Sequence, residues 1–234
     1  MSSICDITPF TLQDFEGLPA CIVWFSGCNM RCAYCYNLSI VLDDHTHIEE
    51  QAVLDFLDSR RGLLEGVVLC GGEPTRYARL YELCRAIKSK GFAIKLDTNG
   101  SNPKMLQRLA PLLDCVALDF KAPGSTFYSI THSHLFKSFE ESFCFLLRRK
   151  IAFEVRTTYH SKLLSYDDLS QMCRFLAHHG YKAPFYIQNY RPQEFTLRDI
   201  GNSEPFDIRA PLKTLRAILE GAIFTLFIGG ARTS

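Results

Sequence analysis

The sequence predicts an α/β fold in which six βα units form a partial, TIM-like (β/α)6 barrel. Short apolar runs alternate with amphipathic stretches from Ala20 onward, which is typical of a parallel sheet with crossover helices. Polar side chains follow each apolar run, and no Ser-, Gly- or Pro-rich linker divides the 234 residues. We therefore expect one domain over residues 1–234, with a core at about 20–191 and a C-terminal extension at 192–234.

Six apolar runs have the length of buried strands, and we expect strands at residues 21–26, 66–70, 92–96, 115–119, 152–158 and 185–189. Caps and apolar stripes predict the helices between them. In chain order, these signals are Thr46-His-Ile-Glu49 leading to about Asp58; Leu80, Leu83, Cys84 and Ile87 before Gly91; Asn102-Pro103; Phe136, Phe139, Phe143 and Leu147; Ser165; and Pro211.

The C-terminal extension contains an irregular stretch at residues 193–210. It is longer than most loops in compact domains, so we interpret it as a docking or lid segment, with disorder as the alternative. The apolar run at 222–229 has the length of a strand and is far shorter than the roughly 20 residues of a membrane span.

The charge pattern argues against nucleic acid as a partner, and the short apolar runs argue against a membrane. The net charge is +1, and acids and bases are interspersed, so no long-range field gathers phosphate backbones. We expect a cytoplasmic protein that binds neither nucleic acid nor membranes.

Three cysteines lie within eight residues, at Cys28, Cys32 and Cys35. They supply one thiolate fewer than a four-iron cubane needs, and an iron without a protein ligand can bind and activate a small molecule. This spacing therefore indicates an enzyme. A zinc site would need a fourth ligand, and His45 and His47 follow too closely to supply it.

Two further interpretations of the cysteines are weaker. One face of a buried helix is disfavoured because Gly27, Asn29 and Asn37 make the segment a poor helix. Disulfides fit worst, because the other cysteines lie singly in apolar stretches and are expected to be reduced core residues: Cys5, Cys21, Cys70, Cys84, Cys115, Cys144 and Cys173.

Polar residues at the predicted strand ends would share one rim of the barrel. Gly71 and Gly72 would let the chain approach a ligand closely, and the Glu73 carboxylate could accept a hydrogen bond from a ligand ammonium group. Asp97, Thr98 and Asn99 offer partners for a sugar, and Lys121 and Arg156 could hold a ligand carboxylate or a negatively charged cluster.

Each of these residues also has an ordinary structural interpretation. Gly-Gly-Glu-Pro could be a simple turn, and Lys121 could be solvated. Arg156 could pair with Glu154 or with an acid across the sheet. Tyr34 and Tyr36 flank the last cysteine and would shield a cluster or contact an adenine face, and Gln188 ends the last predicted strand.

The Cys-x3-Cys-x2-Cys spacing with an aromatic residue before the last cysteine, followed by Gly-Gly-Glu-Pro at the next strand end, resembles the radical S-adenosylmethionine (radical SAM) superfamily. The resemblance implies a barrel of the radical SAM type in which Cys28, Cys32 and Cys35 hold a 4Fe-4S cluster. It also implies that the fourth iron chelates S-adenosylmethionine and that one electron cleaves this cofactor to a 5′-deoxyadenosyl radical.

Within the superfamily, the sequence resembles glycyl-radical-enzyme activases and especially the activating proteins of anaerobic ribonucleoside-triphosphate reductase. The similar stretches are 61–75, 95–103, 116–123, 153–158 and 188–192. The resemblance implies a glycyl radical enzyme as protein substrate and an electron donor of the flavodoxin or ferredoxin type. Tyr36 departs from the pattern, because related proteins usually carry His there.

By the same resemblance, Gly71, Gly72 and Glu73 would contact the cofactor amine, Asn99 and its neighbours the ribose, and Lys121 and Arg156 the carboxylate or an active-site anion. The remaining cofactor-binding candidates are Tyr34, Asp97, Thr98 and Gln188. Similarity to activases of pyruvate formate-lyase makes Asp97, Thr98 and Asp119 candidates for a monovalent cation site.

Two other functions stay open on the sequence. One is a radical SAM enzyme that acts on a small molecule, such as a 7-carboxy-7-deazaguanine synthase. The other is a non-catalytic iron-sulfur or zinc module, which would not cleave the cofactor.

Overall fold

The computed structural model describes residues 3–149, 151–192, 195–206 and 226–230. They form an open sheet of eight strands whose spatial order follows the chain. The strands are β1 (Ile4–Thr11), β2 (Ala20–Phe25), β3 (Gly66–Gly71), β4 (Ala93–Thr98), β5 (Cys115–Asp119), β6 (Phe153–Tyr159), β7 (Phe185–Asn189) and β8 (Leu226–Gly230). The first strand is antiparallel to β2, and all later neighbours are parallel.

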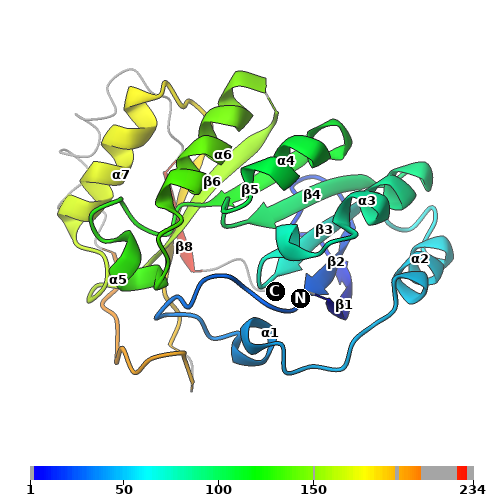
Figure 1. The fold of residues 1–234 in the computed structure, drawn as a ribbon, viewed down its shortest axis with the longest axis horizontal. Helices are drawn as coiled ribbons and strands as arrows, with labels where there is room; N and C mark the ends of the chain where they lie inside the picture. Colours follow the sequence, from blue (N-terminus) through cyan, green and yellow to red (C-terminus); the bar gives the residue numbers. More distant parts are fainter. Residues whose placement is uncertain (1–2, 150, 193–194, 207–225, 231–234) are drawn as a thin grey trace.

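This architecture confirms the predicted partial barrel, and all six predicted strands are present. Figure 1 shows the longer helices along one face of the sheet. The helices are α1 (Leu38–Leu42), α2 (Glu50–Ser59), α3 (Leu80–Ser89), α4 (Pro103–Leu109), α5 (Phe127–Thr131), α6 (Phe136–Arg149) and α7 (Tyr166–His178), with short 3-10 turns at Pro74–Arg76 and Ala110–Leu112. None of the described helices has the length and apolar character needed to cross a membrane.

Two of the predicted helix starts are confirmed by their caps. Asn102 accepts a hydrogen bond from the backbone N–H of Met105 at 3.1 Å, with Pro103 in the first turn of α4. Ser165 and Asp168 form a reciprocal capping box at the start of α7, with bonds of 3.1 Å and 2.9 Å.

The capping box predicted at Thr46 is wrong. The helix begins at Glu50, and Glu49 occupies the N-cap position without a side-chain cap bond. Residues 46–49 are neither helix nor strand, and the N–H of Ile48 donates to the carbonyl of Ile4 in β1 at 2.8 Å. A tertiary backbone bond therefore takes the place of the local cap. The helix predicted from Pro211 lies outside the described residues.

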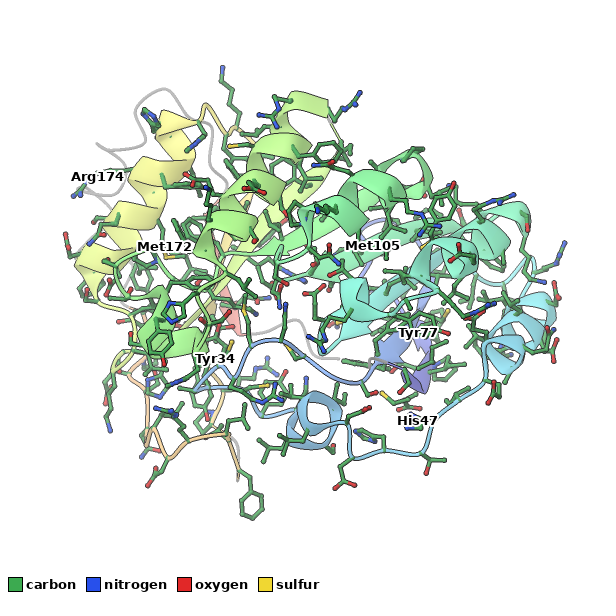
Figure 2. The ribbon with its side chains drawn as sticks, in the orientation of Figure 1. Tyr34, His47, Tyr77, Met105, Met172 and Arg174 are labelled. Atoms are coloured by element: carbon green, nitrogen blue, oxygen red, sulfur yellow. The ribbon has the colours of Figure 1, made fainter. Side chains whose placement is uncertain are left out.

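The sheet separates two apolar regions. The larger lies between the sheet and the helices, where Met172 of α7 is fully buried and Met105 of α4 is partly buried (Figure 2). The smaller fills the barrel interior at the amino ends of the strands, where Phe15 joins Ala20, Ile22 and Val68. Since apolar side chains close that end, the cavity of the barrel lies toward the carboxyl ends of the strands.

Candidate active site

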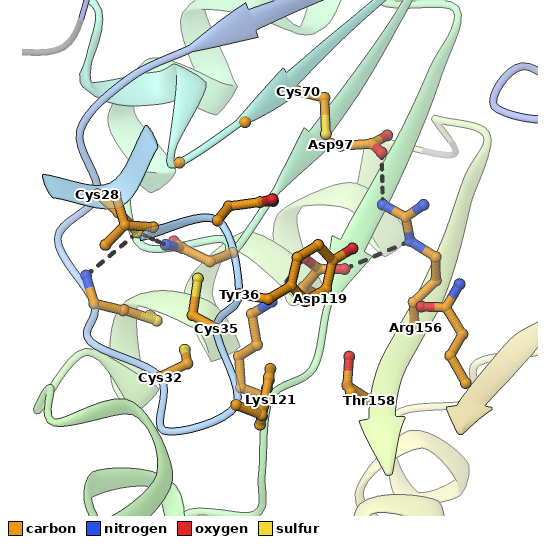
Figure 3. A pocket seen from close by; sticks show the side chains of 18 of the residues that line it. Cys28, Cys32, Cys35, Tyr36, Cys70, Asp97, Asp119, Lys121, Arg156 and Thr158 are labelled. Carbon is orange, nitrogen blue, oxygen red and sulfur yellow. Dashed lines mark hydrogen bonds and ion pairs between the residues drawn. The ribbon is translucent and has the colours of Figure 1, made fainter. Parts of the chain in front are cut away.

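A cavity of about 470 Å³ lies at the carboxyl ends of the parallel strands (Figure 3). Every site residue predicted from the sequence lines it except Glu73. The predicted residues that line it are Cys28, Cys32, Tyr34, Cys35, Gly71, Gly72, Asp97, Thr98, Asn99, Lys121, Arg156 and Gln188. The barrel topology thus brings together groups that are more than 150 residues apart in the sequence.

The cysteine loop, residues 27–37, connects β2 to α1 and is held by backbone hydrogen bonds to two other segments. Arg31 and Ala33 donate to the carbonyls of Thr131 and Ile130 at 2.8 and 2.9 Å, which fixes the loop to α5. On the other side, Leu197 donates to the carbonyl of Cys35 at 3.0 Å. The loop is therefore anchored independently of any ligand, with its three thiols on one cavity.

These thiols fit an iron-sulfur cluster better than a zinc ion. Among the described residues, no group of three Cys, His, Asp or Glu side chains is arranged to hold a metal ion. Ligands of one zinc ion must converge within about 2.3 Å of a single point, whereas a cubane spreads its thiolates over several irons. Backbone and amide N–H groups already face one sulfur, from Met30 at 3.4 Å and from the Asn99 amide at 3.8 Å.

Burial keeps the cysteine thiols protonated in the absence of a metal. It raises the pKa of Cys28 to about 11 and that of Cys32 to about 12, and it also raises the pKa of Cys35. Iron binding must therefore displace protons from these sulfurs, which is the usual coupling between a metal and thiolate ligands.

The glycines of the β3 loop pack against the end of β2. Gly71 has φ +127°, and a Cβ atom there would collide with the backbone of Phe25. A Cβ on Gly72 would collide with the carbonyl of Gly27. Both residues line the cavity, as predicted, but their lack of a side chain is required by contact with β2 and with the cysteine loop.

Glu73 does not line the cavity, where we expected its carboxylate to accept a hydrogen bond from a ligand ammonium group. It is fully buried and accepts hydrogen bonds from the chain itself. These come from the Thr75 N–H at 3.0 Å, the Thr98 hydroxyl at 2.8 Å and the Asn99 N–H at 2.7 Å. Burial raises the pKa of Glu73 although these bonds oppose the shift. Its side chain joins the β3 loop to the end of β4 and positions Asn99.

Lys121 and Arg156 belong to an ionic network inside the cavity. Arg156 lies 2.7 Å from Asp97 and 3.5 Å from Asp119, and Lys121 lies 2.9 Å from Asp119 (Figure 3). Deeper in the barrel, Lys95 lies 3.1 Å from Glu154. Three cations and three carboxylates therefore compensate one another.

The network shifts the pKa values of Lys121, Arg156 and Asp119 so that the charged form of each is favoured. Burial alone would lower the pKa of Lys121 and Arg156, but the neighbouring carboxylates raise both well above their ordinary values. Burial would raise the pKa of Asp119, whereas Lys121 and Arg156 lower it. All three groups are charged at neutral pH.

The same network bears on the predicted monovalent cation site. Asp97 and Asp119 were candidate ligands, and the guanidinium of Arg156 lies between them. Both candidate carboxylates are thus already paired with a protein cation, and the monovalent cation site stays a prediction. The Oδ1 atom of Asp97 is buried and has no hydrogen-bond partner, although the Nζ atom of Lys95 lies 3.9 Å from it.

The aromatic residues that flank Cys35 differ in exposure. Tyr34 is buried, its hydroxyl has no hydrogen-bond partner, and the Nζ atom of Lys121 lies 5.9 Å from its ring centroid. Tyr36 lies at the cavity mouth and is 51% exposed. Of the two, only Tyr34 therefore has the burial expected of a residue that shields a cluster.

Sequence reasoning missed Cys70 and gave no role to Thr158 at the end of its strand, and both residues also line the cavity. Cys70 was expected to be an apolar core residue, but it is only partly buried and its thiol faces the barrel interior near Asp97 (Figure 3). Alternate residues of a strand face the same side of the sheet, and this alternation predicts that both residues face the barrel interior. Cys70 is two residues from the interior Val68, and Thr158 is two residues from Arg156.

The family comparison agrees with this geometry: a model of the radical SAM superfamily matches residues 22–182. A Methanocaldococcus jannaschii protein, provisionally named as a glycyl-radical enzyme activating enzyme, is 25% identical over 202 residues, which cover 83% of this chain and 81% of that protein. A 7-carboxy-7-deazaguanine synthase of Neisseria meningitidis is 28% identical over 193 residues, which cover 81% and 77%.

Solved structures support the fold. Streptococcus suis SuiB bound to its precursor peptide SuiA aligns with a TM-score of 0.71 at 16% identity, over 88% of this chain and 47% of that chain. This chain therefore spans about half the length of SuiB. QueE from Escherichia coli aligns with a TM-score of 0.55 at 16% identity, over 97% of this chain and 93% of that chain.

Proposed function

Because the chain belongs to the radical SAM superfamily, we propose that it is a glycyl-radical-enzyme activase whose protein substrate is an anaerobic ribonucleotide reductase. The cofactors of the superfamily, a 4Fe-4S cluster and S-adenosylmethionine, are also those of this chain. When bound, they supply a 5′-deoxyadenosyl radical that abstracts a hydrogen atom from the substrate. Cys28, Cys32 and Cys35 would hold the cluster, and the ends of β3 to β7 would hold S-adenosylmethionine.

The observation that carries the proposal is a set of exposed apolar side chains on and beside the cysteine loop, called here the apolar mouth. It consists of Tyr36, which is 51% exposed, Leu42, which is 55% exposed, and Phe195, which is 66% exposed. Tyr36 lines the cavity, Leu42 follows the lining residue Val41, and Phe195 lies on the segment bonded to the cysteine loop. Exposed aromatic and aliphatic side chains around an active site suit a protein substrate better than a polar small molecule.

The charge inside the cavity supports the same proposal. Lys121 and Arg156 are both paired with carboxylates, so neither cation is left free to select a strongly charged substrate. The Cα of a glycine residue in a peptide loop carries no charge and needs no such partner. The Oδ1 atom of Asp97 has no hydrogen-bond partner and only a 3.9 Å ion pair with Lys95, so it could accept a hydrogen bond from a backbone N–H of that loop or from a cofactor hydroxyl.

A second candidate function is the synthesis of 7-carboxy-7-deazaguanine. Its support is the similarity to the synthases, which reaches 31% identity over 134 residues with the Methanopyrus kandleri enzyme, although that match covers only 47% of this chain. Under this alternative the exposed apolar mouth would have no role in substrate binding.

The two functions are separated by their products. We expect anaerobically reconstituted protein with S-adenosylmethionine and a reductant to produce a glycyl radical signal, by electron paramagnetic resonance, on an anaerobic ribonucleotide reductase. The control reaction contains the substrate of the synthase and is analysed for 7-carboxy-7-deazaguanine by mass spectrometry. That product, without a glycyl radical on any tested glycyl radical enzyme, would reject the activase.

Variants of the mouth sharpen this test. Replacing Leu42 and Phe195 with Ser should lower glycyl radical formation by roughly tenfold, because exposed apolar anchors dominate interface energies. Cleavage of S-adenosylmethionine without the acceptor should stay close to wild type. Leu63→Ser is a matched control, because Leu63 is 65% exposed and lies outside the cavity.

A further inference from the structure

We propose that Asn99 raises the reduction potential of the cluster by donating a hydrogen bond to the sulfur of Cys28. The Nδ2 atom of Asn99 lies 3.8 Å from the Sγ atom of Cys28, and Figure 3 marks this bond. Asn99 acts through a cluster ligand and is therefore a positioning residue, a role that differs from the ribose contact implied by the resemblance. This inference rests on the cofactors of the superfamily and not on the radical acceptor, so it and the proposed function can fail separately.

The two ends of the Asn99 amide are distinguished by their partners. The backbone N–H of Ser101 donates to Oδ1 of Asn99 at 2.9 Å, so this end of the amide must be the acceptor. The other end, Nδ2, lies 3.1 Å from Oδ1 of Asn29. A flipped amide would place its NH2 group against the N–H of Ser101, where two donors would meet. The NH2 group is therefore the end that faces Cys28.

A closed set of hydrogen bonds, called here the amide network, holds this arrangement. It consists of Asn29, Asn99 and Ser101, and it closes where Nδ2 of Asn29 donates to the Ser101 hydroxyl at 2.7 Å. Asn29 directly follows Cys28, whereas Ser101 lies just beyond the end of β4, so the network joins the cysteine loop to that strand. The Glu73 carboxylate fixes the backbone of Asn99 by accepting its N–H at 2.7 Å.

Burial makes these bonds persistent. The side chains of Asn99 and Ser101 are both buried, so little water competes for their donors and acceptors. An amide N–H that is held in place loses little freedom when it bonds to the sulfur. The donor to Cys28 is therefore in position before any cluster is assembled.

A hydrogen bond to a ligand sulfur favours the more negative state of a cluster. One-electron reduction adds negative charge to the irons and their thiolates, and an N–H donor stabilises that charge. Cys28 already faces the backbone N–H of Met30 at 3.4 Å, and the Asn99 amide adds a second donor. The electron comes from an external one-electron reductant, and neither a proton nor an atom moves with it. The amide therefore makes reduction more favourable for a given reductant.

The test is the midpoint potential of the reconstituted holoenzyme without S-adenosylmethionine, measured by a redox titration followed by electron paramagnetic resonance. We expect Asn99→Ala to lower the equilibrium constant for reduction by roughly threefold, which is about 28 mV for a one-electron couple. Asn102→Ala is the matched control and should leave the potential unchanged. Asn102 lies three residues away and bonds to the Met105 N–H at 3.1 Å and to the carbonyl of Thr75 at 2.9 Å.

A second pair of variants separates the lost donor from added charge. Asn99→Asp keeps the shape of the side chain and an acceptor for the Ser101 N–H, but it removes the donor and adds a negative charge. Asn29→Asp adds the same charge next to Cys28 and keeps an acceptor for the Asn99 amide. We expect Asn99→Asp to lower the equilibrium constant by roughly threefold more than Asn29→Asp. This pair decides the question if iron analysis shows that Asn99→Ala does not hold a cluster.

A purely structural role of the amide network gives different results. It would lower the stability of Asn99→Ala in urea unfolding and leave the potential of the iron-loaded protein at the wild-type value, which would overturn the proposal. Equal shifts of the potential in Asn99→Ala and Asn102→Ala, or in Asn99→Asp and Asn29→Asp, would also overturn it. None of these measurements involves a glycyl radical enzyme, so the outcome is independent of the radical acceptor.

Discussion

Arg156→Met should destabilise the protein by about 3 kcal/mol, because the guanidinium of Arg156 neutralises the buried carboxylate of Asp97 and the partly buried carboxylate of Asp119. It lies 2.7 Å from Asp97 and 3.5 Å from Asp119. Removing one partner of a buried ion pair costs about 3–5 kcal/mol, since the other charge stays buried without compensation. We expect the lower end of this range because Lys121 still lies 2.9 Å from Asp119 and Lys95 lies 3.9 Å from Asp97.

The assay is equilibrium unfolding in urea under anaerobic, reducing conditions, followed by circular dichroism. The double variant Arg156→Met/Asp97→Asn should recover part of the loss, because it removes a carboxylate that the single variant leaves unpaired. Arg174→Met, at an exposed position, should change the stability by less than about 0.5 kcal/mol.

The effect should also depend on pH with a defined sign. In the wild type, Lys121 and Arg156 lower the pKa of Asp119 although burial opposes this, so the paired carboxylate stabilises the fold above its unfolded pKa of about 3.9. That stabilisation is lost as the pH falls through the lower folded pKa. The difference between wild type and Arg156→Met should therefore shrink below about pH 4. A loss under about 1 kcal/mol at pH 7, or a double variant that is no more stable than the single, would refute the reasoning.

Three further predictions follow from the site. Cys32→Ser should lose most of the bound iron after reconstitution and all cleavage of S-adenosylmethionine, whereas Cys144→Ser should keep both, as iron analysis and a deoxyadenosine assay would check. Gly72→Ala should cost about 1–3 kcal/mol in urea unfolding beyond the loss in Gly62→Ala, because only the first Cβ meets backbone atoms; equal losses would contradict this. Exchanging sodium and potassium for tetramethylammonium should leave cofactor cleavage by wild type within about twofold, since a guanidinium already lies between Asp97 and Asp119; an ion-dependent rate would restore the cation site.

Much of the fold and the membership of the site could be predicted from the sequence because the parallel strands are buried on both faces. Such strands are continuous apolar runs that stand out from the amphipathic helices between them. Once the strands are recognised, the topology predicts where the residues that follow them lie, because the carboxyl ends of parallel strands meet at one edge of the sheet. Cys28 and Gln188 could therefore be assigned to one rim without knowledge of any contact between them, and the cavity contains both.

The elements that were missed are those whose stability comes from tertiary contacts. Strand β1 contains Pro9, which weakens the strand signal and is tolerated because β1 pairs only with β2 and is the edge strand. Helices α1 and α5 have five residues each, too few for a periodic pattern. The wrong prediction of a helix start at Thr46 has the same cause, because a backbone hydrogen bond from Ile48 to Ile4 of β1 overrides the local capping signal.

Side-chain roles were harder to predict than side-chain positions, and Glu73 shows why. Sequence alone indicates a carboxylate at the rim, but it does not show which donors reach that carboxylate first. In the folded chain those donors are Thr75, Thr98 and Asn99, so the most conspicuous acid of the motif holds the loops together. Arg156 is similar, because its charge neutralises Asp97 and Asp119 before any ligand arrives. Because Lys121 and Arg156 are paired with Asp119 and Asp97, neither of these cations is free to select a charged substrate. Selectivity must then come from the cysteine-bound cofactor and from the shape and apolar surface of the mouth, which is the arrangement that an activase of a protein backbone would need.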